Sequence, residues 1–189
     1  MKKIKSVFKR DYEGNRQVYD EVTPGCEWVL AGEGVATEKY DGSAMMIDQG
    51  GKPYKRHDVR RGKKAPNGAI PCQESPDPIT GHWPHWVALS DDPADKWFWA
   101  AYNNTDGLRP GTYEAVGPHF QGNPLRLEFD QMWRHGDTPL FGLNRTFEGI
   151  KNYLKNHYIE GIVFHRGNGD MAKIKRVDFG FEWNGKKKK

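Results

Sequence analysis

The sequence is poor in cysteine and has no long apolar run. Only two of its 189 residues are cysteines, Cys26 and Cys72, and they form neither a CxxC pair nor a spacing typical of metal ligands. No stretch approaches the roughly 18 apolar residues of a membrane-spanning helix. The basic residues 1–5 are not followed by the apolar core of a signal peptide. We therefore expect a reduced intracellular protein, cytoplasmic or nuclear and not secreted, with no membrane partner.

Net positive charge is also lacking once the end of the chain is set aside. The formal net charge is +4, and the four lysines at 186–189 account for all of it (4 − 4 = 0). Net charge therefore does not by itself indicate a nucleic-acid partner. Aromatic residues reach 13%, whereas a disordered chain would be poor in them. We predict one folded domain at residues 1–185, followed by a disordered basic tail at 186–189.

Hydrophobic periodicity predicts short strands and two helices. Asp92 followed by Pro93 is typical of a helix start, and the Gly50-Gly51 pair between two strand-like segments predicts a hairpin. The predicted strands are 26–30, 36–40, 43–48, 53–59, 111–116, 160–166 and 171–177, the predicted helices are 93–103 and 145–157, and 62–82 is a predicted loop. This pattern predicts an α+β fold of mostly antiparallel sheets with flanking helices.

Several charged motifs follow one another along the chain. The first is Lys39-Tyr40-Asp41-Gly42, a KxDG tetrapeptide that by itself would also fit a surface lysine before a turn. The motifs after it are Arg60-Arg61, Glu114 at a strand end, Glu160-Gly161, and Lys173 with Lys175. Residues two apart in a strand face the same side, so the last two lysines should point into one cleft.

In this order the motifs resemble those of the covalent nucleotidyltransferase superfamily, which contains ATP-dependent DNA and RNA ligases and mRNA capping enzymes. The segments EKYDGSAMMIDQGGKPYKRHDVRRGKKAP, AIPCQESPDPITGHWPHW and DDPADKW further resemble the small RNA ligase family of the vertebrate 5′–3′ type. The resemblance implies a nucleotidyltransferase fold, an ATP-grasp-like ligase adenylation domain. It implies an enzyme that joins RNA 5′-phosphate and 3′-OH ends. Because the chain ends soon after Lys175, we expect a minimal form without an OB domain.

The implied chemistry begins with Lys39, whose Nζ attacks the α-phosphorus of ATP to form a lysyl-AMP. A free lysine has a pKa of about 10.4 and is protonated at neutral pH, so burial, nearby cations or a metal must favour the neutral amine. Lys173 and Lys175 suit the phosphate oxygens as further catalytic groups. Glu160, and by resemblance Glu114, suit Mg²⁺ or Mn²⁺, because such ions prefer carboxylate and phosphate oxygens.

Other residues are expected to hold the nucleotide. Asp41 and Gly42 would form a tight turn that aims the nucleophile, with Gly42 free to adopt positive φ. Thr37 lies where superfamily members touch the adenine edge, although a plain strand threonine fits equally well, and Glu38 is grouped with it. Phe141 is the candidate platform for adenine, with a core phenylalanine as the alternative.

RNA is the expected partner, and no obligate protein partner is evident. By resemblance, Arg60 or Arg61 contacts the ribose or the incoming 5′-phosphate. A groove along a phosphate backbone would be lined by Arg56, Arg60, Arg61, Lys63 and Lys64, for which a solvated basic loop is the alternative. Stacking on bases is possible for Trp83, Trp86, Trp97 and Trp99, but we predict that they pack in the core.

Two other classes of function stay open. One is a different nucleotidyltransferase, either a DNA ligase or a guanylyltransferase. The expected lack of an OB domain argues against the guanylyltransferase, and the RNA-ligase-like segments argue against the DNA ligase. The other is an RNA-binding module that has lost catalysis. The presence of every motif residue argues against such a module. These residues are Lys39, Asp41, Gly42, Glu114, Glu160, Lys173 and Lys175.

Overall fold

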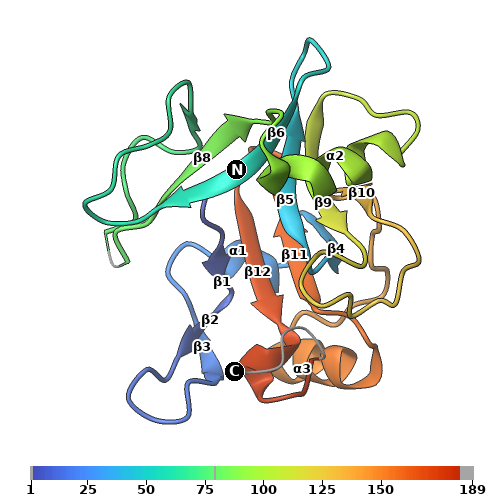
Figure 1. The fold of residues 1–189 in the computed structure, drawn as a ribbon. Coiled ribbons are helices and arrows are strands. Elements are labelled where there is room, and N and C mark those ends of the chain that lie inside the picture. Colours follow the sequence, from blue (N-terminus) through green and yellow to red (C-terminus); the bar gives the residue numbers. More distant parts are fainter. Residues whose placement is uncertain (1, 79, 184–189) are drawn as a thin grey trace. The chain divides into compact units, whose positions relative to one another are not determined.

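The computed structural model describes residues 2–78 and 80–183 (Figure 1), and the predicted tail at 186–189 lies outside them. The chain forms two compact units. The six-stranded unit contains residues 2–3 and Asp41–His135, and the four-stranded unit contains Ile4–Tyr40 and 136–183. The single domain expected from the sequence stays a prediction.

The sheet of the six-stranded unit is antiparallel throughout. Its spatial order is β10 (Gln131–Arg134), β9 (Gly111–Val116), β5 (Ser43–Ile47), β6 (Pro53–Val59), β8 (Trp83–Ala88) and β7 (Ile70–Pro71). Because side chains alternate along a strand, one face collects the apolar residues. That face packs with helix α2 (Lys96–Asn103) in a core that contains Met45, Ile47, Ala101, Tyr113, Ala115 and Met132.

The predicted elements of this unit are confirmed. The hairpin forms between β5 and β6, where Asp48 Oδ1 accepts hydrogen bonds from the backbone N–H groups of Gly50 and Lys52, both at 2.9 Å. The predicted helix begins with a 3₁₀ turn, Pro93–Asp95, that continues into α2. Its cap is Asp92, whose side chain accepts from the N–H of Ala94. The described residues of segment 62–82 form a loop apart from the short β7 (Ile70–Pro71).

A buried ion pair ties this unit together. Asp95 is 1% exposed and accepts hydrogen bonds from Lys55 Nζ of β6, from Ser90 N at 3.0 Å and from Ser90 Oγ at 3.1 Å. Burial by itself would raise the pKa of Asp95, but the hydrogen bonds from Lys55 and Ser90 outweigh it, so the pKa lies below the usual carboxyl value. The carboxylate therefore connects the sheet to the start of the helical segment.

The sheet of the four-stranded unit combines segments that lie far apart in the sequence. Its spatial order is β1 (Lys5–Ser6), β12 (Met171–Lys175), β11 (Gly161–His165) and β4 (Val35–Lys39), with β1 parallel to β12 and the other pairs antiparallel. A separate hairpin joins β2 (Phe8–Arg10) to β3 (Val18–Val22). Helix α3 (Phe147–Asn156), capped by Thr146, supplies Ile150 and Leu154 to a core shared with Ala36, Ile162, Phe164, Ala172 and Ile174.

One prediction in this unit is wrong. Segment 26–30 was expected to be a strand, but residues Glu27–Leu30 form the short helix α1. The Thr23-Pro24-Gly25 turn before it allows local bonds: Cys26 N–H donates to Thr23 O, and the Trp28 indole donates to Gly25 O. An apolar run of this length fits either structure, and here these local bonds favour the helix.

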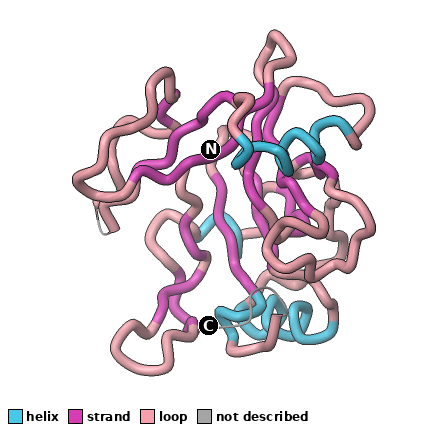
Figure 2. Tube along the Cα trace, in the orientation of Figure 1, coloured by secondary structure: helices cyan, strands magenta, loops and turns pink. Residues whose placement is uncertain are grey.

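The other predicted strands and helices of this unit are confirmed, with shifted ends. The strand expected at 171–177 ends at Lys175, because a 3₁₀ turn, Arg176–Phe179, begins there. Figure 2 shows that strands and loops dominate and that helices are few. The fold is therefore α+β with mostly antiparallel sheets. Within the described residues, no helix has the length and apolar character needed to cross a membrane.

The Lys55–Asp95 pair gives a first test of the fold. We expect Asp95→Asn to lower the free energy of unfolding by about 2 kcal/mol at neutral pH, because the half-buried Lys55 loses its counter-ion. Since folding lowers the pKa of Asp95, the pair stabilises the fold above the ordinary carboxyl pKa and loses this effect as pH falls through the folded value. Urea unfolding of both proteins should therefore give a difference that shrinks in acid. The exposed Asp91→Asn is the matched control, and an equal loss in both variants would contradict the assignment.

Candidate active site

Three of the sequence motifs meet in the four-stranded sheet. In the strand register Gly161 of β11 lies between Lys39 of β4 and Lys175 of β12. Two residues along, Val163 lies between Thr37 and Lys173. Paired residues share a face, so Thr37 and the three lysines project from the same side of the sheet. We call this side, together with His165, the polar face.

The opposite face of the same sheet is apolar. Ala36, Ile162 and Ile174 are almost fully buried in the core with α3. The two-residue alternation therefore separates core packing from chemistry. Glu38 lies on the core side of β4, near Tyr153 of α3. The pKa of Tyr153 is raised by burial and by the Glu38 charge. The structure thus places Glu38 on the other side of β4 from Lys39.

Gly161 has a steric role in this arrangement. A Cβ on this residue would lie 2.3 Å from Ile174 O and 2.9 Å from Lys175 Cα. Real Cβ atoms do not approach backbone so closely, so a side chain here would push β12 away from β11. The glycine that follows Glu160 therefore permits the close strand pairing that places Lys39 and Lys175 in one row.

Glu160 forms an ion pair with Lys39. The carboxylate is 8% exposed, and its Oε2 lies 2.5 Å from Lys39 Nζ, which also donates to Tyr40 O at 3.2 Å. The predicted nucleophile and the predicted metal-binding carboxylate are thus direct neighbours, although 121 residues separate them in the chain. The charged pair holds the lysine side chain at the edge of the polar face.

Lys173 has an altered acidity. Burial, and then the positive charges of Lys39 and Lys175, lower its pKa to about 8, while the charges of Glu160 and Asp178 act in the opposite direction. The cluster therefore disfavours an additional proton. Such an environment suits binding of an anion such as phosphate, which would relieve the repulsion among the lysines.

Asp178 fixes the end of β12. This carboxylate is 3% exposed, accepts from the backbone N–H of Lys175 at 2.8 Å and forms an ion pair with Arg10 of β2. Asp178, three residues after Lys175, thus holds the backbone at the end of the Lys173 and Lys175 motif. Sequence reasoning missed both Asp178 and Arg10, because Arg10 comes from a hairpin 168 residues away and no local pattern joins them.

Thr37 and His165 form a second pair on the polar face. The Thr37 hydroxyl donates to Val163 O at 3.2 Å and accepts from His165 Nε2 at 3.0 Å. Thr37 is 2% exposed, and both roles considered for it stay predictions. Sequence reasoning missed His165. Its place on the predicted strand 160–166 nevertheless puts it on the same face as Gly161 and Val163.

Phe141 is 86% exposed, so the core alternative considered for it is wrong. Leu140 N–H donates to Ala36 O at 2.8 Å, and Phe141 comes next in the chain. It therefore lies near Val35, which is 53% exposed, at the end of β4 away from Lys39. The strand has a charged end and an exposed apolar end.

The chain enters the six-stranded unit at Asp41, so Gly42 and Glu114 are described within that unit. A Cβ on Gly42 would lie 2.0 Å from Ala115 O and 2.9 Å from Glu114 Cγ. Gly42 does not have the positive φ that was expected of it. The residue must be glycine because β9 approaches closely, which corrects the earlier reason.

Glu114 is hydrogen-bonded to a histidine that sequence reasoning missed. His135 Nε2 lies 2.9 Å from Glu114 Oε2, and its Nδ1 lies 3.1 Å from Thr112 Oγ1.

Among the basic residues of this unit, Arg56 forms an ion pair with Asp58 at 3.1 Å. Exposed side chains are found at Arg60, Arg61, Lys63 and Lys64.

No metal cluster is preformed in the part of the chain that the structure describes, since no three His, Cys, Asp or Glu side chains gather there. Glu160 nevertheless offers a carboxylate beside three lysines that suit phosphate. This fits Mg²⁺, which is commonly bound through one or two carboxylates together with substrate phosphates. A metal would therefore be held jointly by Glu160 and a bound nucleotide.

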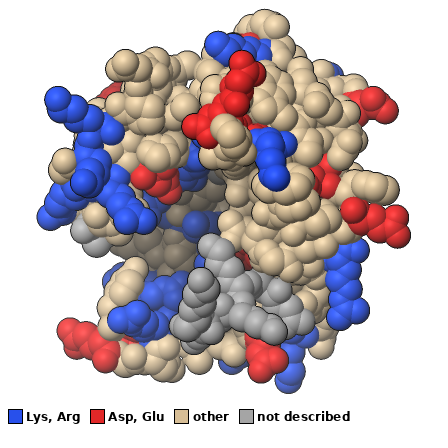
Figure 3. All heavy atoms as spheres, viewed as in Figure 1, with Lys and Arg blue, Asp and Glu red and all other residues tan. Residues whose placement is uncertain are grey.

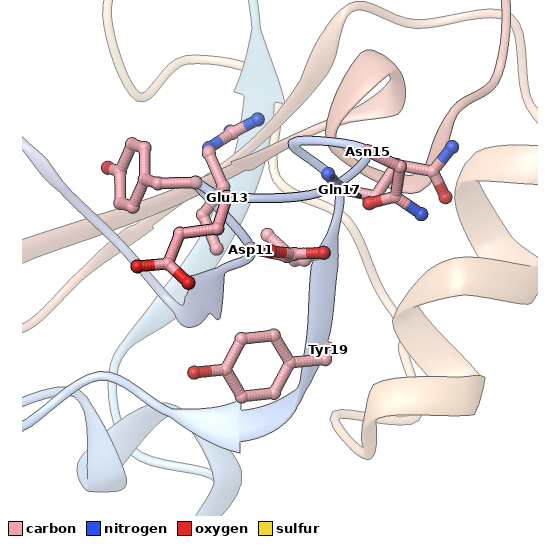
Figure 4. A pocket seen from close by; sticks show the side chains of 8 residues that line it. Asp11, Glu13, Asn15, Gln17 and Tyr19 are labelled. Carbon is pink, nitrogen blue, oxygen red and sulfur yellow. Dashed lines mark hydrogen bonds between the residues drawn. The ribbon is translucent and has the colours of Figure 1, made fainter.

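A hollow of about 560 Å³ lies at the β2–β3 hairpin (Figure 4). Figure 4 shows Asp11, Glu13, Asn15, Gln17 and Tyr19 around it, and Arg10, Tyr12 and Val18 complete the lining. None of the residues predicted to be functional lines this hollow. Its acidic and amide groups do not match the anionic ligand that the lysine cluster favours.

The acidity of Lys173 is directly testable. NMR of the lysine side-chain carbons should show Lys173 titrating with a midpoint of about 8, assigned by its loss in Lys173→Met. In Lys175→Gln the midpoint should move upward, because a repelling positive charge is removed. In Glu160→Gln it should move downward. A midpoint in the ordinary lysine range near 10.4 would contradict this account of the cluster.

The chain matches none of the protein families scanned, and none of the curated proteins searched matches it. The interpretation of the site therefore rests on its residues and their geometry.

Proposed function

We propose that the chain is an ATP-dependent RNA ligase with a nucleotidyltransferase fold, in which Lys39 takes up AMP. The observation that supports this most is the convergence of Lys39, Glu160, Lys173 and Lys175 at the Gly161 end of the polar face. These residues come from three separate segments. A nucleophile, a carboxylate and two phosphate-binding cations are the groups that nucleotidyl transfer requires.

In the first step the bond from Lys39 Nζ to the α-phosphorus of ATP forms. The bond from that phosphorus to the bridging oxygen breaks, and pyrophosphate leaves. Lys39 must lose a proton, and Glu160 Oε2 at 2.5 Å is its hydrogen-bonded acceptor. Lys173 and Lys175 would balance the negative charge on the phosphate oxygens. Mg²⁺ or Mn²⁺, when bound through Glu160 and the phosphates, supplies further charge neutralisation.

In the second step the RNA 5′-phosphate oxygen attacks the same phosphorus, the phosphorus–nitrogen bond breaks, and Lys39 recovers a proton. In the third step the RNA 3′-OH attacks the activated 5′-phosphate, loses its proton and displaces AMP. Both steps build negative charge on phosphate oxygens. Lys173 and Lys175 would stabilise that charge as in the first step.

The two ends of β4 suit the two ends of a nucleotide. Val35 and Lys39 are four residues apart, which is about 13 Å along a strand. The α-phosphate would lie at the lysine end, and the base would lie toward the exposed Val35 and Phe141. Thr37, hydrogen-bonded to His165, lies between these ends. An exposed aromatic ring offers adenine a stacking surface.

The primary test is covalent labelling. Incubation with Mg²⁺ and α-labelled ATP should give an acid-labile AMP adduct that is seen on a denaturing gel and by intact mass. We expect Lys39→Ala to abolish the adduct, while the exposed Lys155→Ala of α3 keeps it. A GMP adduct from labelled GTP would instead indicate capping chemistry. No adduct with either nucleotide, in folded protein that is not already adenylylated, would leave the RNA-binding module as the better account.

A second test addresses Glu160. Glu160→Gln keeps the size of the side chain but removes its charge, so the partner of Lys39 and the metal ligand are both lost. We expect the rate of AMP uptake to fall by at least about 100-fold, the lower range for loss of a proton acceptor, in protein that still folds. The control is Glu148→Gln, on the exposed surface of α3. Wild-type uptake by Glu160→Gln would show that the carboxylate has no such role.

A further inference from the structure

A second hollow lies in the six-stranded unit, beside the loop that follows β6. Its volume is about 290 Å³. Its lining includes the cationic Arg60, Arg61 and Lys63 and the apolar Pro76, Pro78 and Trp83. Figure 3 shows Lys and Arg side chains gathered at the left of the molecule, where Figure 1 draws the loops after β6. The hollow therefore combines cations with apolar walls.

The positive charge of this hollow is not balanced. Within the described residues, the side chains of Arg60, Arg61 and Lys63 have no hydrogen-bond or ion-pair partner. The one acid in the lining, Asp77, is already engaged: its Oδ1 accepts from Thr80 N and Oγ1, both at 2.8 Å, and its Oδ2 pairs with Lys3 at 2.9 Å. Three cations without counter-ions attract an anion.

The Arg61 side chain packs against Gly81. Gly81 has a φ of +69°, and a Cβ on it would lie 2.5 Å from Arg61 Nε. The Arg61 side chain therefore lies directly against the backbone of Gly81, which limits its freedom. A positioned guanidinium binds phosphate with less loss of side-chain entropy than a freely moving one.

Trp83 gives the hollow a flat apolar wall. Its indole Nε1 donates to Gln73 O at 2.8 Å, and its ring meets His85 edge-on with centroids 4.8 Å apart. These contacts fix the ring, which is half-buried and lines the hollow. The core packing predicted for this tryptophan is therefore incomplete. A fixed indole beside unpaired cations is the combination that binds a base and its phosphate in a single strand.

We propose that this hollow binds one nucleotide of a single-stranded nucleic acid, with the phosphate on Arg60, Arg61 and Lys63 and the base against Trp83. The inference deepens the proposed function and rests on it for RNA as the bound strand, but it assigns strand binding to the six-stranded unit and is independent of AMP uptake. A base inside a duplex has both faces covered by its neighbours. The site therefore selects unpaired nucleotides.

The test measures binding without ATP or metal. Fluorescence anisotropy gives the affinity of the full chain for a short oligouridine and for the matched strand that lacks bases, over a range of salt concentrations. We expect the base-free strand to bind wild-type protein about 5-fold to 100-fold more weakly, as loss of one stacked base predicts. Trp83→Leu should lose this preference, and Trp83→Phe should keep most of it. A duplex of the same length should not distinguish Trp83→Leu from wild type.

The charge contribution is measured separately. Arg60→Gln and Arg61→Gln should each reduce the dependence of log affinity on log salt by up to about 0.7, the value for one phosphate contact on a single strand. The exposed Arg109→Gln, outside the hollow, should leave it unchanged. An unchanged salt dependence in both hollow variants would overturn the proposal. Equal affinity of the wild-type protein for the two strands would also overturn it. That comparison needs no substitution, so it decides the question even if Trp83→Leu does not fold. A negative result here leaves AMP uptake untouched, and a failed AMP adduct leaves this binding untouched.

Discussion

The pairing of β4, β11 and β12 at Gly161 is the constraint on which the candidate site depends. This glycine lets the three strands approach closely enough for Lys39 and Lys175 to stand in one row. A slip of one residue in the β4–β11 pairing would turn Lys39 into the apolar core. A slip in the β11–β12 pairing would do the same to Lys173 and Lys175, and core residues would then reach the surface. The core contacts of Ile162, Phe164 and Ile174 therefore fix the register of the chemistry on the other face.

Electrostatics adds a second constraint, because clustering three lysines is unfavourable unless acids compensate. Glu160 compensates at Lys39, and Asp178, itself paired with Arg10, holds the backbone of Lys175. Burial, and after it the repulsion from Lys39 and Lys175, lowers the pKa of Lys173. A bound phosphate would remove this repulsion, so the free energy stored in the cluster favours binding of an anion. The ion pairs thus link the stability of the sheet to its proposed chemistry.

The six-stranded unit follows the same plan. Met45, Tyr113 and Met132 face the core with α2, whereas Glu114 projects from the opposite face with His135. In both sheets the strand alternation buries one side and leaves charged or polar groups on the other. Each unit therefore supports a different part of the proposed activity: AMP transfer on the lysine cluster, and strand binding beside Trp83.

The sequence by itself determined the α+β class, the β5–β6 hairpin, the two longer helices with the Asp92 cap of the first, and the strands that carry the charged motifs. These features follow from local signals, such as Asp92 before Pro93 or the alternation around Lys173, and local signals do not depend on distant partners. Only the tertiary structure decided that the Glu38 side of β4 faces α3, that Gly42 is required by the approach of β9, and that Phe141 is exposed. It alone joined Arg10 to Asp178 and His135 to Glu114. Such contacts depend on strand register, close packing and desolvation, which arise only when segments far apart in the chain are brought together.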